Sequence, residues 1–324
     1  MEHGTGDGSQ KQAYGIGFLG IREGDHMKKR SFISMLLVCL LAAAMLLGGC
    51  GQSSSSGGFN VIVLGQIGHG KSEVTSSIAS AYGQKISVDQ LNNAKECKSG
   101  SVTYHAQCVS IKSESRNYNI YDLPDYNDIC KSIASQGIVP DGAILVIDMD
   151  DRVMPQTHEQ IEMIKGLGIK NVVVYISNCT DSALVELLMT DVESFGLEKV
   201  EFVTDYDNYS SENAQKVVSV MDKWSADGNE AKSVSGTAVG VYTYHLSEQD
   251  GGKNSPIFTS DSLDITINNK TYKGRLATPG VDMMMPGDMG QEVFELDENV
   301  SVKAGDKVTV KIGDATLMVG VVIG

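Results

Sequence analysis

The fold of this 324-residue chain is decided by one stretch, Phe59-Asn60-Val61-Ile62-Val63-Leu64-Gly65-Gln66-Ile67-Gly68-His69-Gly70-Lys71-Ser72. Its apolar half runs into a glycine loop that fills the phosphate-binding pattern G-x-x-x-x-G-K-[ST]. Glycines let backbone N–H groups face an anion, and a helix that starts at the lysine adds the positive end of its dipole. The stretch therefore predicts a strand, a phosphate-binding loop and a helix over 71–82.

The loop supplies most of the candidate site residues. Lys71 is expected to bring its positive charge to the outer phosphates of a nucleotide, and the Ser72 hydroxyl is expected to ligate Mg²⁺. The predicted nucleotide-binding residues of the loop are Gly65, Gly68, His69, Gly70, Lys71 and Ser72. The loop alone leaves open whether a bound nucleotide is hydrolysed.

Length and charge limit the classes of protein that need to be considered. A chain of this length predicts about two domains, each long enough for an apolar core. The formal net charge is −15, with 41% hydrophobic and 21% charged residues. Such an acidic chain repels phosphate backbones, and its sequence has no basic patch, which argues against nonspecific binding of nucleic acid.

The segment 27–49 has the pattern of an export signal, because a basic start, Met27-Lys28-Lys29-Arg30, precedes an apolar run. Its end, Leu47-Gly48-Gly49-Cys50, resembles the lipobox of bacterial lipoproteins, in which the cysteine is lipidated. Cys50 is thus the predicted lipidation site, and 50–58 is a Ser/Gly-rich tether. An uncleaved membrane anchor is the alternative, since the apolar run of about 17 residues is at the lower limit for spanning. Either interpretation places the globular part outside the cytoplasm, and the lipobox predicts a lipid anchor on the extracytoplasmic face of the membrane.

Residues 1–26 fit no export signal, and Met27 is the better initiator. We therefore expect 1–26 to be an over-called start.

From residue 59 to 224, short apolar runs alternate with segments of helical period. This alternation predicts an α/β domain with a mostly parallel sheet and helices on both faces. Beyond the loop, strands are expected at 102–111, 116–121, 142–148, 171–176 and 199–203, with helices at 126–136, 156–166, 181–195 and 211–224.

Several segments of this domain resemble elongation factor Tu. Gly65 to Ser72 is similar to its loop G-H-V-D-H-G-K-T, and residues 116–124 (RNYNIYDLP) resemble its R-H-Y-A-H-V-D-C-P. Residues 140–146 (PDGAILV) with 154–157 (MPQT) resemble its M-D-G-A-I-L-V and M-P-Q-T-R-E segments. The domain is identified as a member of the elongation-factor GTPases, which implies GTP or GDP with Mg²⁺ as ligands.

The resemblance implies metal-site roles for two further residues. Asp122 matches the aspartate of the D-x-x-G motif, which acts near Mg²⁺, and Thr103 falls where the first switch presents a metal-binding threonine. The alternatives are a capping aspartate and a surface threonine.

Two departures from the family pattern concern hydrolysis. Asp125 replaces the family glycine whose backbone N–H donates to the γ-phosphate, and it brings a negative charge toward that phosphate. Tyr126 stands at the position of the histidine that orients the attacking water, but it lacks the positive charge that helps in the transition state. Hydrolysis is therefore expected to be slow or absent.

The guanine-reading motif N-K-x-D is also altered. An offset of one residue gives Asn178-Cys179-Thr180-Asp181, which keeps Asn178 and Asp181 and lacks the lysine. Asp181 could instead cap the helix expected at 181–195.

The last part of the chain predicts a small antiparallel β-barrel at 238–324, after a polar linker at 225–237. Residues 247–256 (SEQDGGKNSP) and 281–288 (VDMMMPGD) resemble S-K-D-E-G-G-R-H-T-P and V-E-M-V-M-P-G-D in the third domain of elongation factor Tu. The middle, tRNA-holding domain of the family has no counterpart, so no tRNA is expected as a partner, and an unknown protein partner is. A slow but genuine GTPase and a nucleotide-free interaction module are the alternatives.

Overall fold

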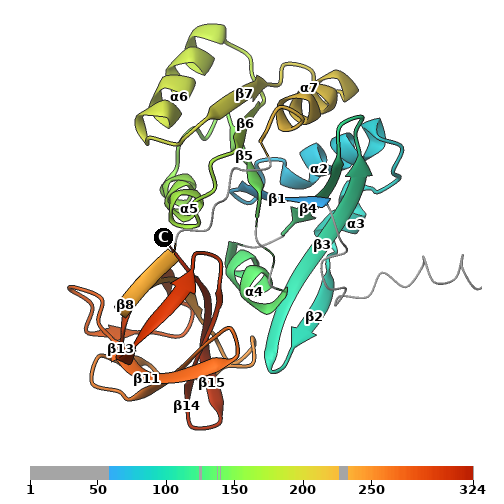
Figure 1. The fold of residues 1–324 in the computed structure, drawn as a ribbon. Coiled ribbons are helices and arrows are strands. Elements are labelled where there is room, and N and C mark those ends of the chain that lie inside the picture. The colour runs from blue at the N-terminus through green and yellow to red at the C-terminus, as the bar shows by residue number, and fades with distance from the viewer. Residues whose placement is uncertain (1–57, 124–125, 137, 139, 226–232, 324) are drawn as a thin grey trace, which may run out of the picture. The chain divides into compact units, whose positions relative to one another are not determined.

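A computed structural model describes residues 58–123, 126–136, 138, 140–225 and 233–323 (Figure 1). The predictions for 1–26, for the signal 27–49, for Cys50 with its tether as far as residue 57, and for Asp125 fall outside these residues. No helix among the described residues combines the length and the apolar character that crossing a membrane requires.

The first part of the chain folds into a seven-stranded sheet of order β2-β3-β4-β1-β5-β6-β7. Its parallel strands are β4 (Asn117–Asp122), β1 (Gly58–Gly65), β5 (Gly142–Asp148), β6 (Val172–Ser177) and β7 (Val200–Thr204). An antiparallel hairpin, β2 (Lys95–Ser99) and β3 (Val102–Lys112), continues the sheet beyond β4. The glycine loop follows β1, in the middle of the sheet.

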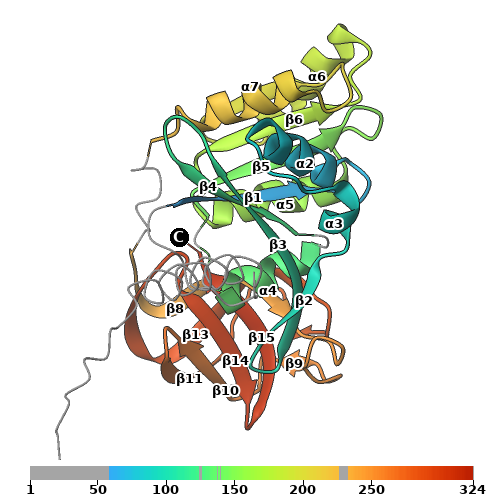
Figure 2. The same ribbon diagram turned by 90° about the vertical axis from the view of Figure 1, so that its right-hand side faces the viewer.

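Helices cover both faces of this sheet (Figure 2). One face carries α2 (Lys71–Ala81) and α7 (Ser211–Met221), with the short α3 (Val88–Asn92) beside α2. The other face carries α4 (Tyr126–Gln136), α5 (Pro155–Gly166) and α6 (Ser182–Ser194). The predicted α/β fold class is therefore confirmed.

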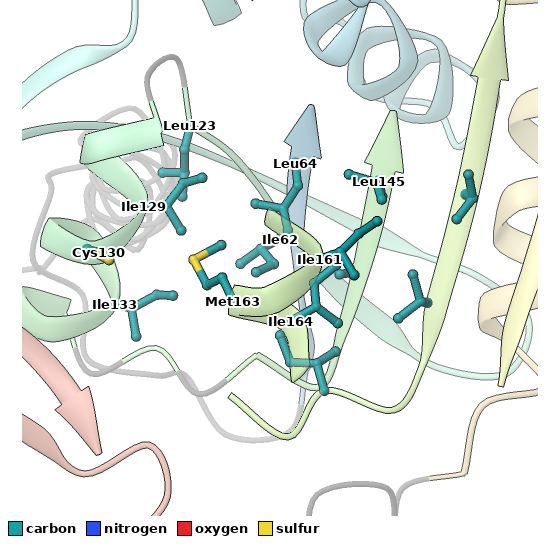
Figure 3. Close-up of a cluster of buried hydrophobic side chains, with 14 of the residues drawn as sticks. Ile62, Leu64, Leu123, Ile129, Cys130, Ile133, Leu145, Ile161, Met163 and Ile164 are labelled. Atoms are coloured by element: carbon teal, nitrogen blue, oxygen red, sulfur yellow. The ribbon is translucent and has the colours of Figure 1, made fainter. Parts of the chain in front are cut away.

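Two apolar cores result from the alternation of side chains along β1. Val61 and Val63 join the core under α2 and α7, and Ile62 and Leu64 join the core under α4 and α5 (Figure 3). All four side chains are 0% exposed. A strand buried on both faces needs a continuous apolar sequence, which is why all four residues from 61 to 64 are apolar.

The second part is a closed antiparallel barrel of order β10-β11-β13-β8-β15-β14. The strands are β8 (Ser233–His245), β10 (Leu263–Ile267), β11 (Lys270–Leu276), β13 (Met289–Lys303), β14 (Lys307–Ile312) and β15 (Ala315–Val322). A separate ribbon pairs β9 (Ile257–Phe258) with β12 (Met283–Met284). The barrel has its own core, in which Phe294 and Val241 are fully buried.

The barrel confirms the predicted class and corrects one boundary. Asn268 and Asn269 have φ of 47° and 69° and join β10 to β11 as a two-residue turn. The linker predicted over 225–237 is too long, because β8 begins at Ser233 and residues 233–236 pair with residues 300–303 of β13. These residues are small and polar, so their sequence resembles a linker although their backbone belongs to the sheet.

A buried charged cluster joins α4 and β3 to the loop after β8. Lys131 of α4 is 5% exposed, and its Nζ lies 2.9 Å from Asp128 Oδ1 and 2.8 Å from Asp250 Oδ1. The Tyr244 hydroxyl donates to Asp250 Oδ2 at 2.7 Å. Burial acts to raise the pKa of Asp250, but hydrogen bonds from Lys131, Ser247 and Tyr244 outweigh it and lower that pKa. The cluster therefore holds Asp250 as a carboxylate against Lys131.

Candidate functional site

The glycine loop lies between the carboxyl end of β1 and the start of α2, and two of its glycines are required by its shape. Gly65 has φ of 148°, and a Cβ there would lie 2.6 Å from the Val146 carbonyl oxygen. Gly70 has φ of 93° and is the N-cap residue of α2, whose first turn has no side-chain cap. The first N–H groups of α2 are thus left for a ligand, as an anion site at a helix N-terminus requires.

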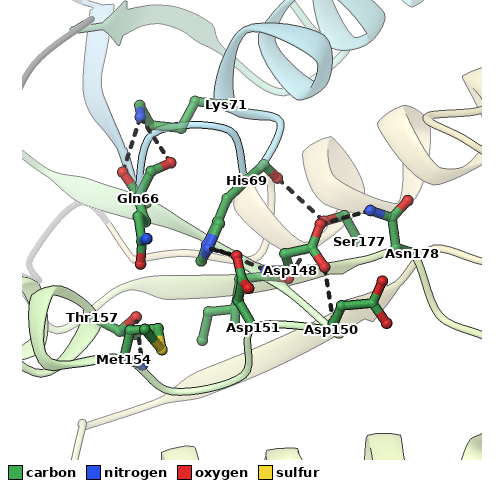
Figure 4. A network of polar contacts seen from close by, with 12 residues as sticks. Gln66, His69, Lys71, Asp148, Asp150, Asp151, Met154, Thr157, Ser177 and Asn178 are labelled. Carbon is green, nitrogen blue, oxygen red and sulfur yellow. Dashed lines mark hydrogen bonds and ion pairs between the residues drawn. The ribbon is translucent and has the colours of Figure 1, made fainter.

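Lys71 lies across the mouth of this loop (Figure 4). Its Nζ donates to the carbonyl oxygens of Gly65 at 2.9 Å and Gln66 at 3.2 Å. The ammonium group is therefore fixed at the position where the loop backbone and the start of α2 converge. A polyanion at this position would meet both a positive charge and backbone donors.

The side chain of His69 is bound within the protein, and its predicted part in nucleotide binding stays a prediction. Its side chain is 1% exposed, its Nδ1 accepts from the Asp148 N–H at 3.3 Å, and its Nε2 lies 3.1 Å from Asp151 Oδ2. The Ser177 hydroxyl donates to the His69 carbonyl oxygen at 3.2 Å. Because Nδ1 accepts, the proton of a neutral ring is on Nε2 and faces Asp151. His69 therefore braces the loop against β5 and β6, and its side chain points away from a ligand in the loop.

Asp122, at the end of β4, is the most unusual carboxylate of the site. It is 1% exposed, and neither of its oxygens has a hydrogen-bond partner among the described residues. Burial raises its pKa, while the Ser72 hydroxyl, which approaches the carboxylate without forming a well-aligned hydrogen bond, and the positive charge of Lys71 act to lower it. A buried carboxylate without a hydrogen bond is costly, so its position next to Ser72 fits a site that a cation and its water ligands complete.

The structure does not bring Thr103 together with Asp122, and its part in the metal site stays a prediction. Asp122 is paired with Gln107 of β3, and Thr103 precedes Gln107 by four residues of the same strand. About 13 Å of extended chain separates those two positions on β3. The Thr103 N–H donates to the Asp250 carbonyl oxygen at 3.1 Å, so the pairing of β2 with β3 carries Thr103 to the barrel.

The two residues predicted to read guanine are bound by other parts of the protein. The Asn178 amide donates to Asp148 Oδ2 at 2.6 Å. Asp181 Oδ1 accepts from the N–H groups of Ala183 at 2.8 Å and Leu184 at 3.3 Å. Asp181 is thus the N-cap residue of α6, which is the alternative that the sequence left open. Guanine recognition by this pair stays a prediction.

The structure adds two residues that the sequence analysis missed, both in the loop after β7. Asp205 is 1% exposed, and its carboxylate accepts from the N–H groups of Asp207 and Tyr209 and from the amide of Asn213. This arrangement brings Tyr209 against Gly70 of the phosphate loop. An aspartate that precedes polar residues at spacings of two and four is a signal for such a turn, but it does not indicate what the turn contacts.

Tyr126 is the first residue of α4. Its position after β4 and Asp122 agrees with the order of the family motif, and the described side chains do not include its own.

The comparison with known families agrees with this arrangement. The family model of the elongation factor Tu GTP binding domain matches residues 58–250, which is more than half of the chain. The match includes the glycine loop, the whole seven-stranded sheet and the first barrel strand with the loop that carries Asp250. The chain therefore belongs to the family of the elongation factor Tu GTP-binding domain.

Proposed function

We propose that this protein binds GTP or GDP with Mg²⁺ in the loop 65–72, and that it hydrolyses GTP slowly or not at all. The observation that carries the proposal is the buried Asp122 carboxylate without a hydrogen bond, next to Ser72 and Lys71. Family membership supports guanine nucleotide as the ligand.

The residues present fit a Mg²⁺ ion. Ser72 would ligate it, and Asp122 would hold its water ligands. When bound, the ion neutralises negative charge on the phosphates. Lys71 and the uncapped first turn of α2 would bind and orient the same phosphates.

Slow hydrolysis is proposed from the two residues at the family's glycine and histidine positions. Asp125 would repel the γ-phosphate, and Tyr126 can orient a water but cannot carry a positive charge. The double variant Asp125→Gly, Tyr126→His restores the family residues at both positions.

Calorimetric titration of the purified full-length chain with Mg·GTP is expected to show tight binding, with weaker binding of Mg·ATP. Phosphate release by the wild-type protein should stay close to background, and the double variant should release phosphate at least about tenfold faster. Rapid release by the wild-type chain would instead identify a genuine GTPase. An absence of heat with either nucleotide would favour the nucleotide-free interaction module.

A matched pair of lysine variants tests where nucleotide binds. Lys71→Ala removes the ammonium group from the loop and should weaken binding by about tenfold or more, because hydrogen bonds to charged groups are worth about 1.5–3 kcal/mol. Lys85→Ala removes an exposed lysine outside the site and should leave the affinity unchanged. Equal affinities of the two variants would contradict the assignment of the loop.

We also propose that a lipid on Cys50 holds the protein at the extracytoplasmic face of the bacterial membrane, where it meets a protein partner and no tRNA. The export pattern of 27–49 supports this proposal. Cells grown with labelled palmitate should incorporate label into the wild-type protein and not into Cys50→Ser, with the label in the membrane fraction. Equal labelling of both would show that Cys50 is not the modified residue.

A further inference from the structure

We infer that Tyr209 gates the nucleotide site, because its phenol fills the space beside Gly70 that the phosphates of a bound nucleotide need. This inference rests on the proposed nucleotide binding and concerns the rate at which nucleotide enters.

The contact between Gly70 and Tyr209 locates the phenol. A Cβ built on Gly70 would collide with the Tyr209 hydroxyl and would lie 2.6 Å from Cζ and 2.9 Å from Cε1 of the ring. A Cβ built on Gly68, another glycine of the loop, would meet nothing within 4 Å. The Tyr209 ring therefore occupies the space beside Gly70, whereas the space beside Gly68 is open.

That open side is where a phosphate is expected. A glycine without a Cβ allows a ligand to approach the backbone closely, and Gly70 is also the N-cap residue of α2. Lys71, the next residue, adds its ammonium group on the same loop. The Tyr209 hydroxyl is a small neutral group at a position suited to an anion, so the two compete for one place.

Tyr209 is held in this position by the protein around it. Its N–H donates to Asp205 Oδ2 at 2.6 Å, and its carbonyl oxygen accepts from the Ser77 hydroxyl at 2.7 Å. Its ring stacks on Tyr175, with centroids 6.1 Å apart and an interplanar angle of 7°.

The backbone of this loop is strained. Asn208 and Tyr209 have φ of 52° and 59°, a region that residues with side chains enter at a cost. Two consecutive residues in that region persist because Asp205 and Ser77 fix the loop around them. Because the hydrogen bonds to Asp205 and Ser77 fix the backbone, the site opens when the side chain of Tyr209 rotates and its ring leaves Tyr175.

The rate of nucleotide entry tests the gate. Stopped-flow mixing of the full-length chain with a fluorescent N-methylanthraniloyl-GTP and Mg²⁺ should give slow association for the wild-type protein. Tyr209→Gly removes the ring and suits the positive φ, and it should accelerate association by about tenfold, comparable to losing one aromatic stack. Tyr209→Phe keeps the ring and should associate within about threefold of the wild-type rate.

The outcomes separate the gate from nucleotide binding itself. Equal association rates for the wild-type protein and Tyr209→Gly would overturn the gate and leave the proposed function standing. Weaker or slower binding by Tyr209→Gly would also overturn the gate, because the ring would then support the nucleotide. An absence of binding by all three proteins, each with a cooperative thermal transition, would overturn both.

Discussion

Replacing Lys131 by methionine is expected to lower the free energy of unfolding by about 3–5 kcal/mol, the cost of breaking a buried ion pair by removing one partner. The substitution keeps the length of the side chain but leaves Asp128 and Asp250 without their shared cation. Both carboxylates are largely covered, with side chains 6% and 15% exposed. Chemical denaturation of the wild-type protein and the variant at neutral pH measures the difference.

Lys165→Met is the matched control, because Lys165 makes an ion pair with Glu162 on the exposed surface of α5, with N···O of 2.9 Å. Its effect should stay below about 1 kcal/mol, since solvent screens such pairs. The double variant Lys131→Met, Asp250→Asn should recover part of the lost stability. Similar losses for the two single variants would show that the buried cluster contributes no more than a surface pair.

Replacing Asp122 by asparagine is expected to raise the stability of the nucleotide-free protein at neutral pH by about 1–3 kcal/mol, because it removes a buried charge without a hydrogen bond. The same substitution should abolish the Mg²⁺ dependence of GTP binding, since the carboxylate would no longer hold the ligands of the ion. Denaturation without nucleotide and titration with and without Mg²⁺ measure the two effects. A variant less stable than the wild-type protein would contradict the cost assigned to this carboxylate.

The stability difference between Asp122→Asn and the wild-type protein should depend on pH. The pKa of Asp122 is raised in the folded protein above the ordinary value of 3.8. The folded state therefore holds this proton more tightly than the unfolded state, and the wild-type protein loses that stability as the pH rises through the folded pKa. The advantage of the variant should accordingly be small below pH 3.8 and grow to a plateau above the folded pKa.

The architecture of the first domain was predictable from its sequence because local signals agreed. The run Val61 to Leu64 is apolar at every position, as a strand buried on both faces must be, and the glycine loop predicts the turn and the helix that come after this strand. β11 and β13 are harder to predict, since most of their charged residues are exposed and only closure of the barrel reveals their pairing. β2 was missed for a related reason: four of its five residues are polar or charged, and its pairing with β3 is its main support.

The candidate site, too, was predictable only where a local sequence signal exists. Asp122 lies close to Lys71 and Ser72 because it ends β4, they follow β1, and the carboxyl ends of these two parallel strands share one edge of the sheet. The contact of Tyr209 with Gly70 spans 139 positions of sequence, and no local pattern indicates it. The position of Thr103 depends on strand pairing, which its local sequence does not reveal and which brings its N–H to the Asp250 carbonyl oxygen.

Neither the barrel nor the core around α4 can be completed before β15 has been synthesised. This strand follows all the other described elements in the chain, yet it lies between β8 and β14 in the closed barrel. Its residues Val319 and Val321 also share one apolar core with Ile129 and Ile133 of α4. The helix α4 is thus made well before the strand that covers it, and it keeps an uncovered apolar face until β15 has been synthesised. Loss of β15 by truncation would open the barrel and at the same time expose the apolar face of α4 in the first domain.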